Sequence, residues 1–479
     1  MLQDADALPQ LVGDYKPLDQ WQTHLNQLFY GLRGDKLRSY YQTFASADFR
    51  LAHALAADYH DRVTKREQDR SRQPSSSARL PNDASRLTIM ELGPGNGNLA
   101  ACFLSHLKAL DTQDLVYPRV RYVMIDWEQP MLDGALAHPD LAPHQAHVDI
   151  YCGSVEHVSG IAEGTVDRII CNELWNDLPT KLLAKHGGEV EEEYVRPNLN
   201  ETLHATIQDW SAFVRAFQAR DLDVLRTFPP FLDELVWEKE YRKVEWKDVP
   251  YRKTIVEFLQ RIDQDVLVPV NVGAFATLKE AKRLLAPDAV GFSAFDAGTV
   301  DIKVLNDPEK PCYGQFGGQH SFMINFALVE AVAKQVGMTA TTFEPQREFV
   351  GRSLNTNAIT LMELLATHPS AGPKLRPWEQ DRLVLKTIRA LNETFESPYR
   401  RRLEFPLGTN MPPEERETLG AILRSLKDTG IPDTVAYVTE DELTRAQTDL
   451  ENLGYEIDAI KMALQVPPSS IEYCHFSCR

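Results

Sequence analysis

The sequence lacks any long apolar run. No stretch of the 479 residues approaches the roughly 18 consecutive apolar residues that a membrane-spanning helix needs. The first ten residues, MLQDADALPQ, contain neither a basic segment nor an apolar one, so they do not resemble a secretory signal. We therefore expect a protein that neither enters a membrane nor is exported.

Cysteine and positive charge are also scarce. Six cysteines are too few for a disulfide scaffold, and Cys102, Cys152 and Cys171 lie in apolar runs typical of reduced core thiols. This usage favours a reducing, cytoplasmic location. Lysine and arginine total 51 against 69 aspartates and glutamates, and a net charge of −18 argues against a general nucleic-acid binder. A surplus of acid suits solubility, and it also suits a basic substrate.

Short apolar runs of strand length alternate with helical patterns from residue 87 onward. Apolar strands separated by helices indicate a mainly parallel, doubly wound sheet with helices on both faces, which is an α/β fold class. The hydrophobic content of 43% and the charged content of 25% are those of an ordinary globular protein. The predicted strands are LTIMEL (87–92), VRYVMID (120–126), VDIYC (148–152), VDRIICN (166–172) and AVGFSAFD (289–296).

The patterning divides the chain into four parts. Residues 1–68 predict an N-terminal helical segment, and residues 69–86, rich in serine, proline and arginine, predict a flexible linker. The α/β domain is expected over 87–372, with an aromatic-rich insertion of helices at about 196–280. Such an insertion would cap the carboxyl ends of the strands, where α/β sheets bind ligands, or would only enlarge the core. Residues 373–479 predict a helical C-terminal extension with helices at 378–396, 413–427 and 440–464, either an interaction module or an addition packed on the sheet.

The most informative segment is ELGPGNGN, residues 91–98. It follows a predicted strand and opens a helix, and its alternating glycines allow backbone to touch a ligand at the helix N-terminus. The spacing is not that of the nicotinamide dinucleotide fingerprint, and no lysine–serine pair makes it a phosphate-binding loop. The acid Glu91 would repel a phosphate, but it suits a cationic amino group. Asp126 ends the next strand, where a carboxylate can accept both ribose hydroxyls.

A nucleoside with an amino-acid tail and no phosphate fits these residues, and S-adenosylmethionine is such a ligand. A purely structural turn from strand to helix is the alternative. The motif ELGPGNGNL also resembles the first motif of class I S-adenosylmethionine-dependent methyltransferases. The segment NELWNDLP (172–179) is similar to the NEFFDALP signature of the MidA-like methyltransferases, the family of the mitochondrial complex I assembly-factor methyltransferase. Segments 295–298 and 321–326 follow in that family's order, and the resemblance covers 87–365.

The resemblance implies a class I, Rossmann-like methyltransferase fold, S-adenosylmethionine as cofactor, and a protein arginine on a partner protein as the methyl acceptor. The chain departs from the family pattern at named positions. The family's acid after the two aromatics is Asn176 here, with Asp177 one place later, and two late aspartates appear as Gln319 and Asn325. We therefore expect a divergent member of the family, to which the family's cofactor site can be assigned better than the family's substrate.

Methyl transfer requires an aligned donor and acceptor, exclusion of water and removal of one proton. Asn172 ends the fourth predicted strand and Glu173 directly follows it, where the methyl group must leave, so Asn172 is also a catalytic candidate. A carboxylate there can orient a planar guanidinium by a bidentate pair, so Glu173 is the first catalytic candidate and Asp177 the second. Structural alternatives are a helix cap for Glu173 and a turn residue for Asp177. Asp296, which ends the fifth strand, could line the pocket.

We assign cofactor binding to the glycine loop and to the residues after the second, third and fourth strands. The cofactor residues are Glu91, Gly93, Gly95, Gly97, Asn98, Asp126, Trp127, Ser154, Val155 and Asn172. Cys474, His475 and Cys478 cluster near the C-terminus, but zinc usually needs four ligands, and we predict no metal site.

The predicted function is therefore S-adenosylmethionine-dependent N-methylation of a protein arginine on a partner protein. Two alternatives stay open: a small-molecule methyltransferase, and a cofactor-binding assembly factor without turnover. The expected partner is a protein or peptide, and no nucleic acid is expected. A homodimer is compatible with the sequence.

Overall fold

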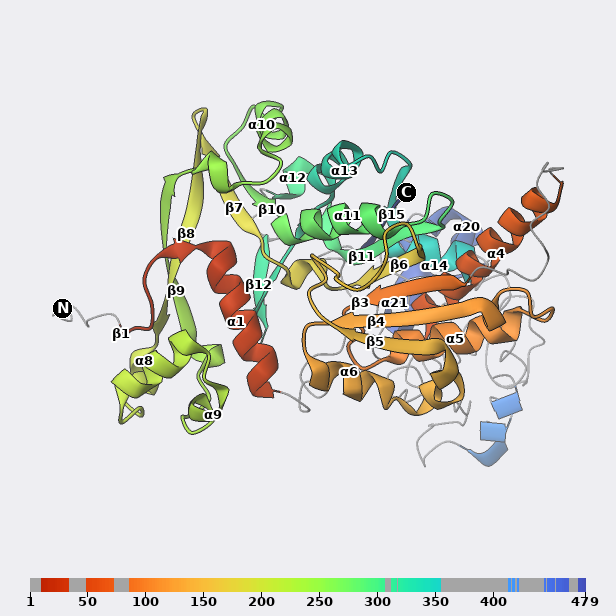
Figure 1. Cartoon of the computed structure of the whole chain (residues 1–479), viewed down its shortest axis with the longest axis horizontal. Coiled ribbons are helices and arrows are strands. Elements are labelled where there is room, and N and C mark those ends of the chain that lie inside the picture. Colours follow the sequence, from red (N-terminus) through yellow and green to blue (C-terminus); the bar gives the residue numbers. More distant parts are fainter. Residues whose placement is uncertain are drawn as a thin grey trace.

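The described part of the computed structural model has two large sheets flanked by helices and a small two-stranded one (Figure 1). It describes residues 10–33, 49–72, 86–305, 312–316, 318–354 and 473–479, and short segments between 412 and 464. The predicted helix at 378–396 lies outside the described residues. The predicted helix at 413–427 lies mostly outside them.

The main sheet is mostly parallel, as predicted. Its strand order is β15-β16-β11-β6-β3-β4-β5, with the short β14 pairing β11. The four strands predicted between residues 87 and 172 are confirmed, and the fifth is observed at Gly291–Thr299 rather than 289–296. The strands are β3 (Leu87–Leu92), β4 (Val120–Asp126), β5 (Val148–Cys152), β6 (Val166–Asn172), β11 (Gly291–Thr299), β14 (Ile324–Asn325), β15 (Thr341–Pro345) and β16 (Tyr473–Cys478).

Helices cover both faces of the main sheet, which explains why its parallel strands are continuous apolar runs. Helices α10, α11 and α13 pack on one face. Helices α4, α5, α6 and α14 pack on the other. The helices are α4 (Arg50–Arg72), α5 (Asn98–Leu110), α6 (Gln129–Leu136), α10 (Arg252–Gln260), α11 (Val272–Leu284), α13 (Phe326–Gln335) and α14 (Gln346–Leu354). The α/β fold class is confirmed.

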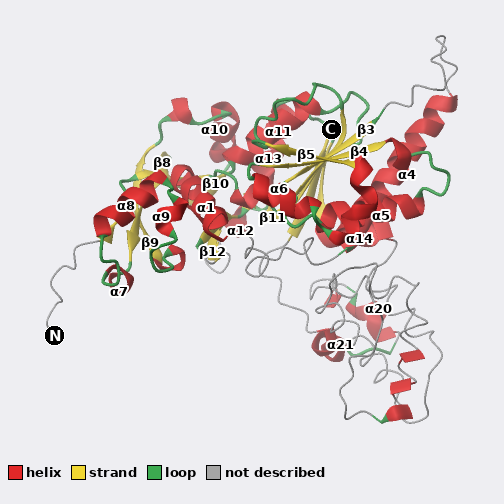
Figure 2. Ribbon diagram, turned by 60° about the horizontal axis from the view of Figure 1, so that its bottom comes forward, coloured by secondary structure: helices red, strands yellow, loops and turns green. Residues whose placement is uncertain are grey.

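A second, antiparallel sheet lies beside the main one (Figure 2). Its strands are β1 (Gln10–Leu11), β2 (Lys16–Pro17), β7 (Lys181–His186), β8 (Glu189–Leu199), β9 (Leu235–Lys243) and β10 (Val266–Val270). Helices α1 (Leu18–Arg33) and α8 (Trp210–Ala219) share its apolar core. The short helices α7 (Glu201–His204) and α9 (Leu222–Leu225) flank α8, and α12 (Ile302–Leu305) follows β11.

The prediction of an all-helical insertion at 196–280 is wrong. Strand β9 pairs with β8 along its whole length, from Leu235 opposite Leu199 to Lys243 opposite Glu191. This pairing joins segments about 40 residues apart, so long-range hydrogen bonds outweigh the local helical pattern. Helix α11 joins β10 to β11 and packs in the main core. The N-terminal segment is not one unit either, because α1 packs on the second sheet and α4 on the main one.

The prediction that 373–479 is only a helical extension is also wrong. Residues 473–478 form β16, an interior strand that pairs antiparallel with β11 on one side and β15 on the other. No local signal marks this strand, because both of its partners lie more than 120 residues earlier in the chain. The predicted helix at 440–464 is observed as α20 (Gln447–Asn452) and α21 (Ile457–Leu464), and Gly454 between them has a φ of +88°. Helix α4 reaches Arg72, beyond the predicted linker start, and residues 73–85 are outside the described part.

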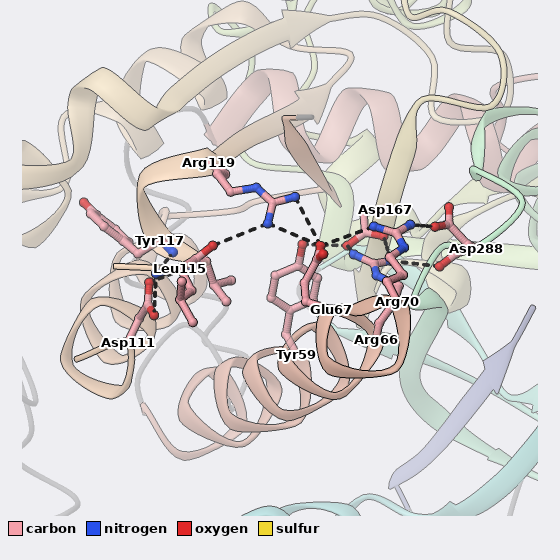
Figure 3. A network of polar contacts seen from close by, with 11 residues as sticks. Tyr59, Arg66, Glu67, Arg70, Asp111, Leu115, Tyr117, Arg119, Asp167 and Asp288 are labelled. Atoms are coloured by element: carbon pink, nitrogen blue, oxygen red, sulfur yellow. Dashed lines mark hydrogen bonds and ion pairs between the residues drawn. The ribbon is translucent and has the colours of Figure 1, made fainter. Parts of the chain in front are cut away.

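Helix α4 is held to the main sheet by a network of polar contacts (Figure 3). The Tyr59 hydroxyl donates to Asp167, at the start of β6, at 2.7 Å, and Arg66 donates to the same carboxylate at 2.5 Å. The next residue, Glu67, accepts from Arg119 at 3.3 Å. These contacts fix α4 across the edge of the sheet opposite the carboxyl ends of the parallel strands.

A chain of buried polar groups crosses four neighbouring strands. Arg168 on β6 donates to the Ser293 hydroxyl on β11 at 2.9 Å, and that hydroxyl lies 3.0 Å from His475 Nε2 on β16. His475 Nδ1 lies 3.0 Å from a Glu344 oxygen on β15. Burial lowers the pKa of His475, so the neutral ring accepts from Ser293 and donates to Glu344. This series of polar contacts fixes the register of β16 between β11 and β15.

We expect His475→Phe to lower the free energy of unfolding by about 3 kcal/mol, because the ring shape is kept while Ser293 and Glu344 lose a buried partner. Urea denaturation measures this change. His186→Phe is the matched control, because His186 is 60% exposed beside Asp265 and its loss should cost less than about 0.5 kcal/mol. Equal losses in the two variants would show that the polar chain contributes nothing specific.

Candidate active site

The glycine loop lies at the carboxyl end of β3, as α/β ligand loops do. Gly93, Gly95 and Gly97 all have positive φ, at +68°, +54° and +81°. A Cβ added at Gly97 would lie 2.5 Å from the Ala135 carbonyl oxygen of α6, so this glycine is needed for helix packing. At Gly95 no heavy atom of the described residues lies within 4 Å of such a Cβ. The open side of the loop is therefore at Gly95, where a ligand can approach backbone.

Glu91 and Asn98 flank the loop: Glu91 lies near the end of β3, and Asn98 begins α5. The Glu91 carboxylate is buried and accepts a hydrogen bond from Tyr122 at 2.9 Å. Burial raises the pKa of Glu91 to about 7, so near neutral pH about half of the free protein holds this acid protonated. The Asn98 side chain is buried at the start of α5, where its oxygen accepts from the Cys102 thiol. Glu91 is thus poised to ionise beside a positive charge.

Asp126 ends β4 beside the loop. One of its oxygens accepts from the Glu128 backbone N–H at 2.9 Å, and burial raises the pKa of Asp126 to about 6. Trp127 follows directly and is 46% exposed, which leaves its ring available to stack on a base. After β5, Ser154 is exposed and Val155 is half-buried against the main core. The structure brings these four residues to the same end of neighbouring strands β4 and β5.

Two acids meet where β6 ends beside β11, with Glu173 directly after β6 and Asp296 within β11. The Glu173 backbone N–H donates to the Phe295 carbonyl at 2.7 Å, which places Glu173 beside Asp296. Both residues are buried, with exposed fractions of 8% and 1%. The Asp296 oxygens accept from the backbone N–H groups of Asn176 and Ala297, at 3.1 and 2.8 Å. Burial and the nearby charge of Glu173 nevertheless hold the pKa of Asp296 well above its ordinary range.

Glu173 also has an uncommon backbone, with a φ of +46°. Glutamate rarely adopts this left-handed region, and such residues concentrate at functional sites. The following 3-10 turn, Trp175–Asp177, begins without a side-chain cap in the described structure. Capping therefore does not explain Glu173.

Asp177, the second catalytic candidate, is bound to other parts of the protein. It accepts from the Tyr30 hydroxyl of α1 and from the Gln319 amide of β13 (Gln319–Phe322), which pairs with β12 (Tyr313–Phe316). Burial raises the pKa of Asp177 to about 7. Two departures from the family pattern, Asp177 and Gln319, thus contact one another. The Tyr30 contact joins α1 to the turn after β6, and the Gln319 contact joins β13 to the same turn.

Two amide oxygens in this region have no partner among the described residues. Asn172 Oδ1 and Asn176 Oδ1 are both buried without a hydrogen bond. Buried polar atoms are normally satisfied, so an orphaned oxygen at a strand end points to a ligand or water at that place. With the open side of Gly95 and the carboxylate of Asp126, these residues fit a polar cofactor with an amino-acid tail.

Sequence analysis missed Tyr473. This residue begins β16, lies opposite Ala297 of β11, and forms a hydrogen bond with the Glu173 side chain. No pattern in the sequence predicts this contact, because Tyr473 is 300 residues from Glu173 in the chain.

The C-terminal thiols and imidazole do not converge on a metal. The Cys474 thiol contacts the Gly298 carbonyl and the Cys478 thiol contacts Met338, whereas His475 points to Ser293. Strand alternation places both thiols on the opposite face from the imidazole. Within the described ranges, no group of three histidine, cysteine or acidic side chains is arranged to hold a metal ion. No helix in those ranges is both long enough and apolar enough to cross a membrane.

Comparison with known proteins identifies the cofactor. Residues 71–266 match the family described as "Putative S-adenosyl-L-methionine-dependent methyltransferase". The cofactor is S-adenosylmethionine, and the enzyme class is methyltransferase. The matched segment includes the glycine loop, Asp126 and Glu173. No curated protein matches the chain in sequence.

Two solved structures from Burkholderia thailandensis are similar to this chain. One, bound to S-adenosyl-homocysteine, is 15% identical, with 76% of this chain and 81% of that chain covered and a TM-score of 0.47. The other, an uncharacterized protein, is 13% identical, with 74% and 78% covered and a TM-score of 0.45. Similarity at this level assigns neither a substrate nor a partner.

The two glycines should respond differently to alanine. We expect Gly95→Ala to weaken S-adenosylmethionine binding at least tenfold, because the methyl group enters the open side of the loop, while the free energy of unfolding falls by only about 1 kcal/mol. Gly97→Ala should destabilise by about 2 kcal/mol or more, because α6 must move. Calorimetric titration and urea denaturation measure the two effects. Wild-type affinity in Gly95→Ala would place the cofactor elsewhere.

Glu91 should make the stability of the free protein depend on pH. The folded-state pKa of about 7 lies above the ordinary 4.5, so the folded state binds more protons between these values. The contribution of Glu91 to the free energy of unfolding therefore falls as pH rises, by about 3 kcal/mol in total. Glu91→Gln should remove this part of the slope. The variant should be more stable than wild type at pH 8, and it should bind S-adenosylmethionine more weakly.

Urea denaturation between pH 5 and pH 8 tests this expectation. The control is Glu189→Gln, at the exposed first residue of β8. Identical pH slopes in wild type and Glu91→Gln would contradict it.

Proposed function

We propose that this protein transfers the methyl group of S-adenosylmethionine to a nitrogen of a protein arginine, as the MidA-like methyltransferases that it resembles do. The observation that carries the proposal is the pair of buried acids, Glu173 and Asp296, at adjacent strand ends beside the glycine loop. We further propose a protein or peptide partner and a cytoplasmic location, which the six free cysteines support.

A cationic acceptor explains why two acids are buried together. Like charges at short distance raise each other's pKa, and a guanidinium between them would relieve this repulsion. The Asp296 oxygens accept from two backbone amides, whereas Glu173 directly follows β6 beside the partly exposed Tyr473, so we propose that Glu173 contacts the acceptor. A carboxylate can orient the planar guanidinium by two parallel hydrogen bonds, and it can hold the proton that the nitrogen releases.

The cofactor residues are proposed from the same geometry. Backbone at Gly95 would face the methionine part, with Glu91 beneath its amino group. The Asp126 carboxylate would accept the ribose hydroxyls, and Trp127, Ser154 and Val155 would surround the base. The cofactor supplies a methyl group on a positively charged sulfur. The protein contributes alignment and exclusion of water, since the chemistry itself needs no covalent intermediate.

We expect Glu173→Gln to lower kcat at least 100-fold while the affinity for S-adenosylmethionine changes less than about twofold, because the amide keeps the shape but neither orients the cation nor holds the proton. The assay follows labelled methyl groups into arginine-containing peptides, with the same peptides carrying lysine in place of arginine as substrate control. Glu189→Gln, on the exposed hairpin, is the control variant.

Three outcomes separate the alternatives. Unchanged turnover in Glu173→Gln would contradict the proposed role of this acid. Cofactor binding without transfer to any peptide favours an assembly factor without turnover. Transfer to free guanidines or amines, but not to peptides, favours a small-molecule methyltransferase.

A further inference from the structure

We propose that Tyr473, on the last strand of the chain, is a positioning residue of the acceptor site, where its hydroxyl holds the Glu173 carboxylate in place. This inference rests on the proposed function of Glu173. It adds a residue that lies outside the segment matched to the methyltransferase family, which ends at residue 266.

Strand pairing brings the two residues together. On β16, Cys474 lies opposite Asp296 and Tyr473 lies opposite Ala297, so Tyr473 stands just past the acid pair at the carboxyl end of β11. On the other side of β11, Glu173 follows β6 and is bonded through its backbone N–H to the Phe295 carbonyl. Glu173 and Tyr473 therefore meet from two strands that flank the same central strand.

In this contact the Tyr473 hydroxyl acts as a hydrogen-bond donor that keeps its proton. The Tyr473 hydroxyl lies within hydrogen-bonding reach of Glu173, and partial burial together with the charges of Glu173 and Asp296 raises the pKa of Tyr473 above its ordinary range. The phenol thus stays protonated throughout the neutral range and donates to the carboxylate. The Tyr473 side chain is also 43% exposed, so an acceptor that reaches Glu173 also meets Tyr473.

Glu173 needs such a partner more than an ordinary glutamate does. Its left-handed backbone, with φ at +46°, costs free energy and must be held by its surroundings. Glu173 is buried beside Asp296, and its charge helps to raise the pKa of Asp296. A hydrogen bond to the charged form favours ionisation, so the Tyr473 donor counteracts the repulsion between Glu173 and Asp296.

The contact also links the acceptor site to the end of the chain. Two residues after Tyr473, His475 is fixed by Ser293 and Glu344 in the buried polar chain. The register of β16 thereby sets the position of the Tyr473 hydroxyl. The acceptor site is complete only when the last strand occupies its place between β11 and β15.

The test is Tyr473→Phe in the full-length protein, which removes the hydroxyl and keeps the ring. We expect kcat with the arginine peptide to fall about tenfold or more, while affinity for S-adenosylmethionine and the melting temperature stay at wild-type values. The pKa of Glu173 should rise, because the charged form loses a donor. NMR titration of protein with ¹³C-labelled glutamate carboxyl groups measures this pKa, and Glu173→Gln identifies the signal.

Tyr241→Phe is the matched control. Tyr241 is also 43% exposed, and it donates to a glutamate, Glu193, at 2.8 Å in the second sheet. This variant should leave kcat and the Glu173 titration unchanged.

An unchanged Glu173 titration in Tyr473→Phe overturns the inference. A joint fall of melting temperature and cofactor affinity also overturns it, because it would mark a merely structural role. If wild-type protein methylates no arginine peptide, the proposed function fails by itself. The NMR titration still decides whether Tyr473 holds Glu173, since it requires no acceptor.

Discussion

The backbone pairing of β16 between β11 and β15 is the interaction on which the rest of this structure depends. Without it, β11 would be an edge strand with unpaired backbone groups, and β15 would have no partner in the described sheet. The buried chain from Arg168 through Ser293 and His475 to Glu344 gives this pairing one register. Because the polar groups are satisfied only in that register, a slip by one residue would leave several of them buried and unpaired.

The same pairing shapes the acid-lined end of the sheet. Glu91, Asp126 and Asp296 are all buried enough to have a raised pKa in the free protein. Burying carboxyl groups costs stability, and bound positive charge offsets that cost. S-adenosylmethionine carries a sulfonium and an ammonium group, so the cofactor itself brings charges of the required sign. The acidic site is therefore less stable alone than with its ligand, as linkage between binding and folding requires.

The second sheet is tied to the site by the N-terminal helix. The Gln22 side chain of α1 donates to the Leu178 carbonyl and accepts from the Thr180 backbone N–H, at 2.9 and 2.7 Å. On the same helix, Tyr30 donates to Asp177. The turn after β6, which carries Glu173 at its start, is thus held from the main sheet on one side and from α1 on the other. Movement of the second sheet relative to the main one would pull directly on this turn.

The sequence by itself determined the parallel half of the main sheet and the cofactor loop. The strands at 87–92, 120–126 and 166–172 are buried on both faces and the edge strand at 148–152 is partly exposed, yet each is a short apolar run, and the glycines of the loop are local requirements of backbone geometry. Strands β9 and β16 and the partners of Asp177 and Glu173 were decided only by the tertiary structure. These strands and contacts form between segments that are distant in the chain. Neither segment alone carries a periodic pattern that predicts the pairing.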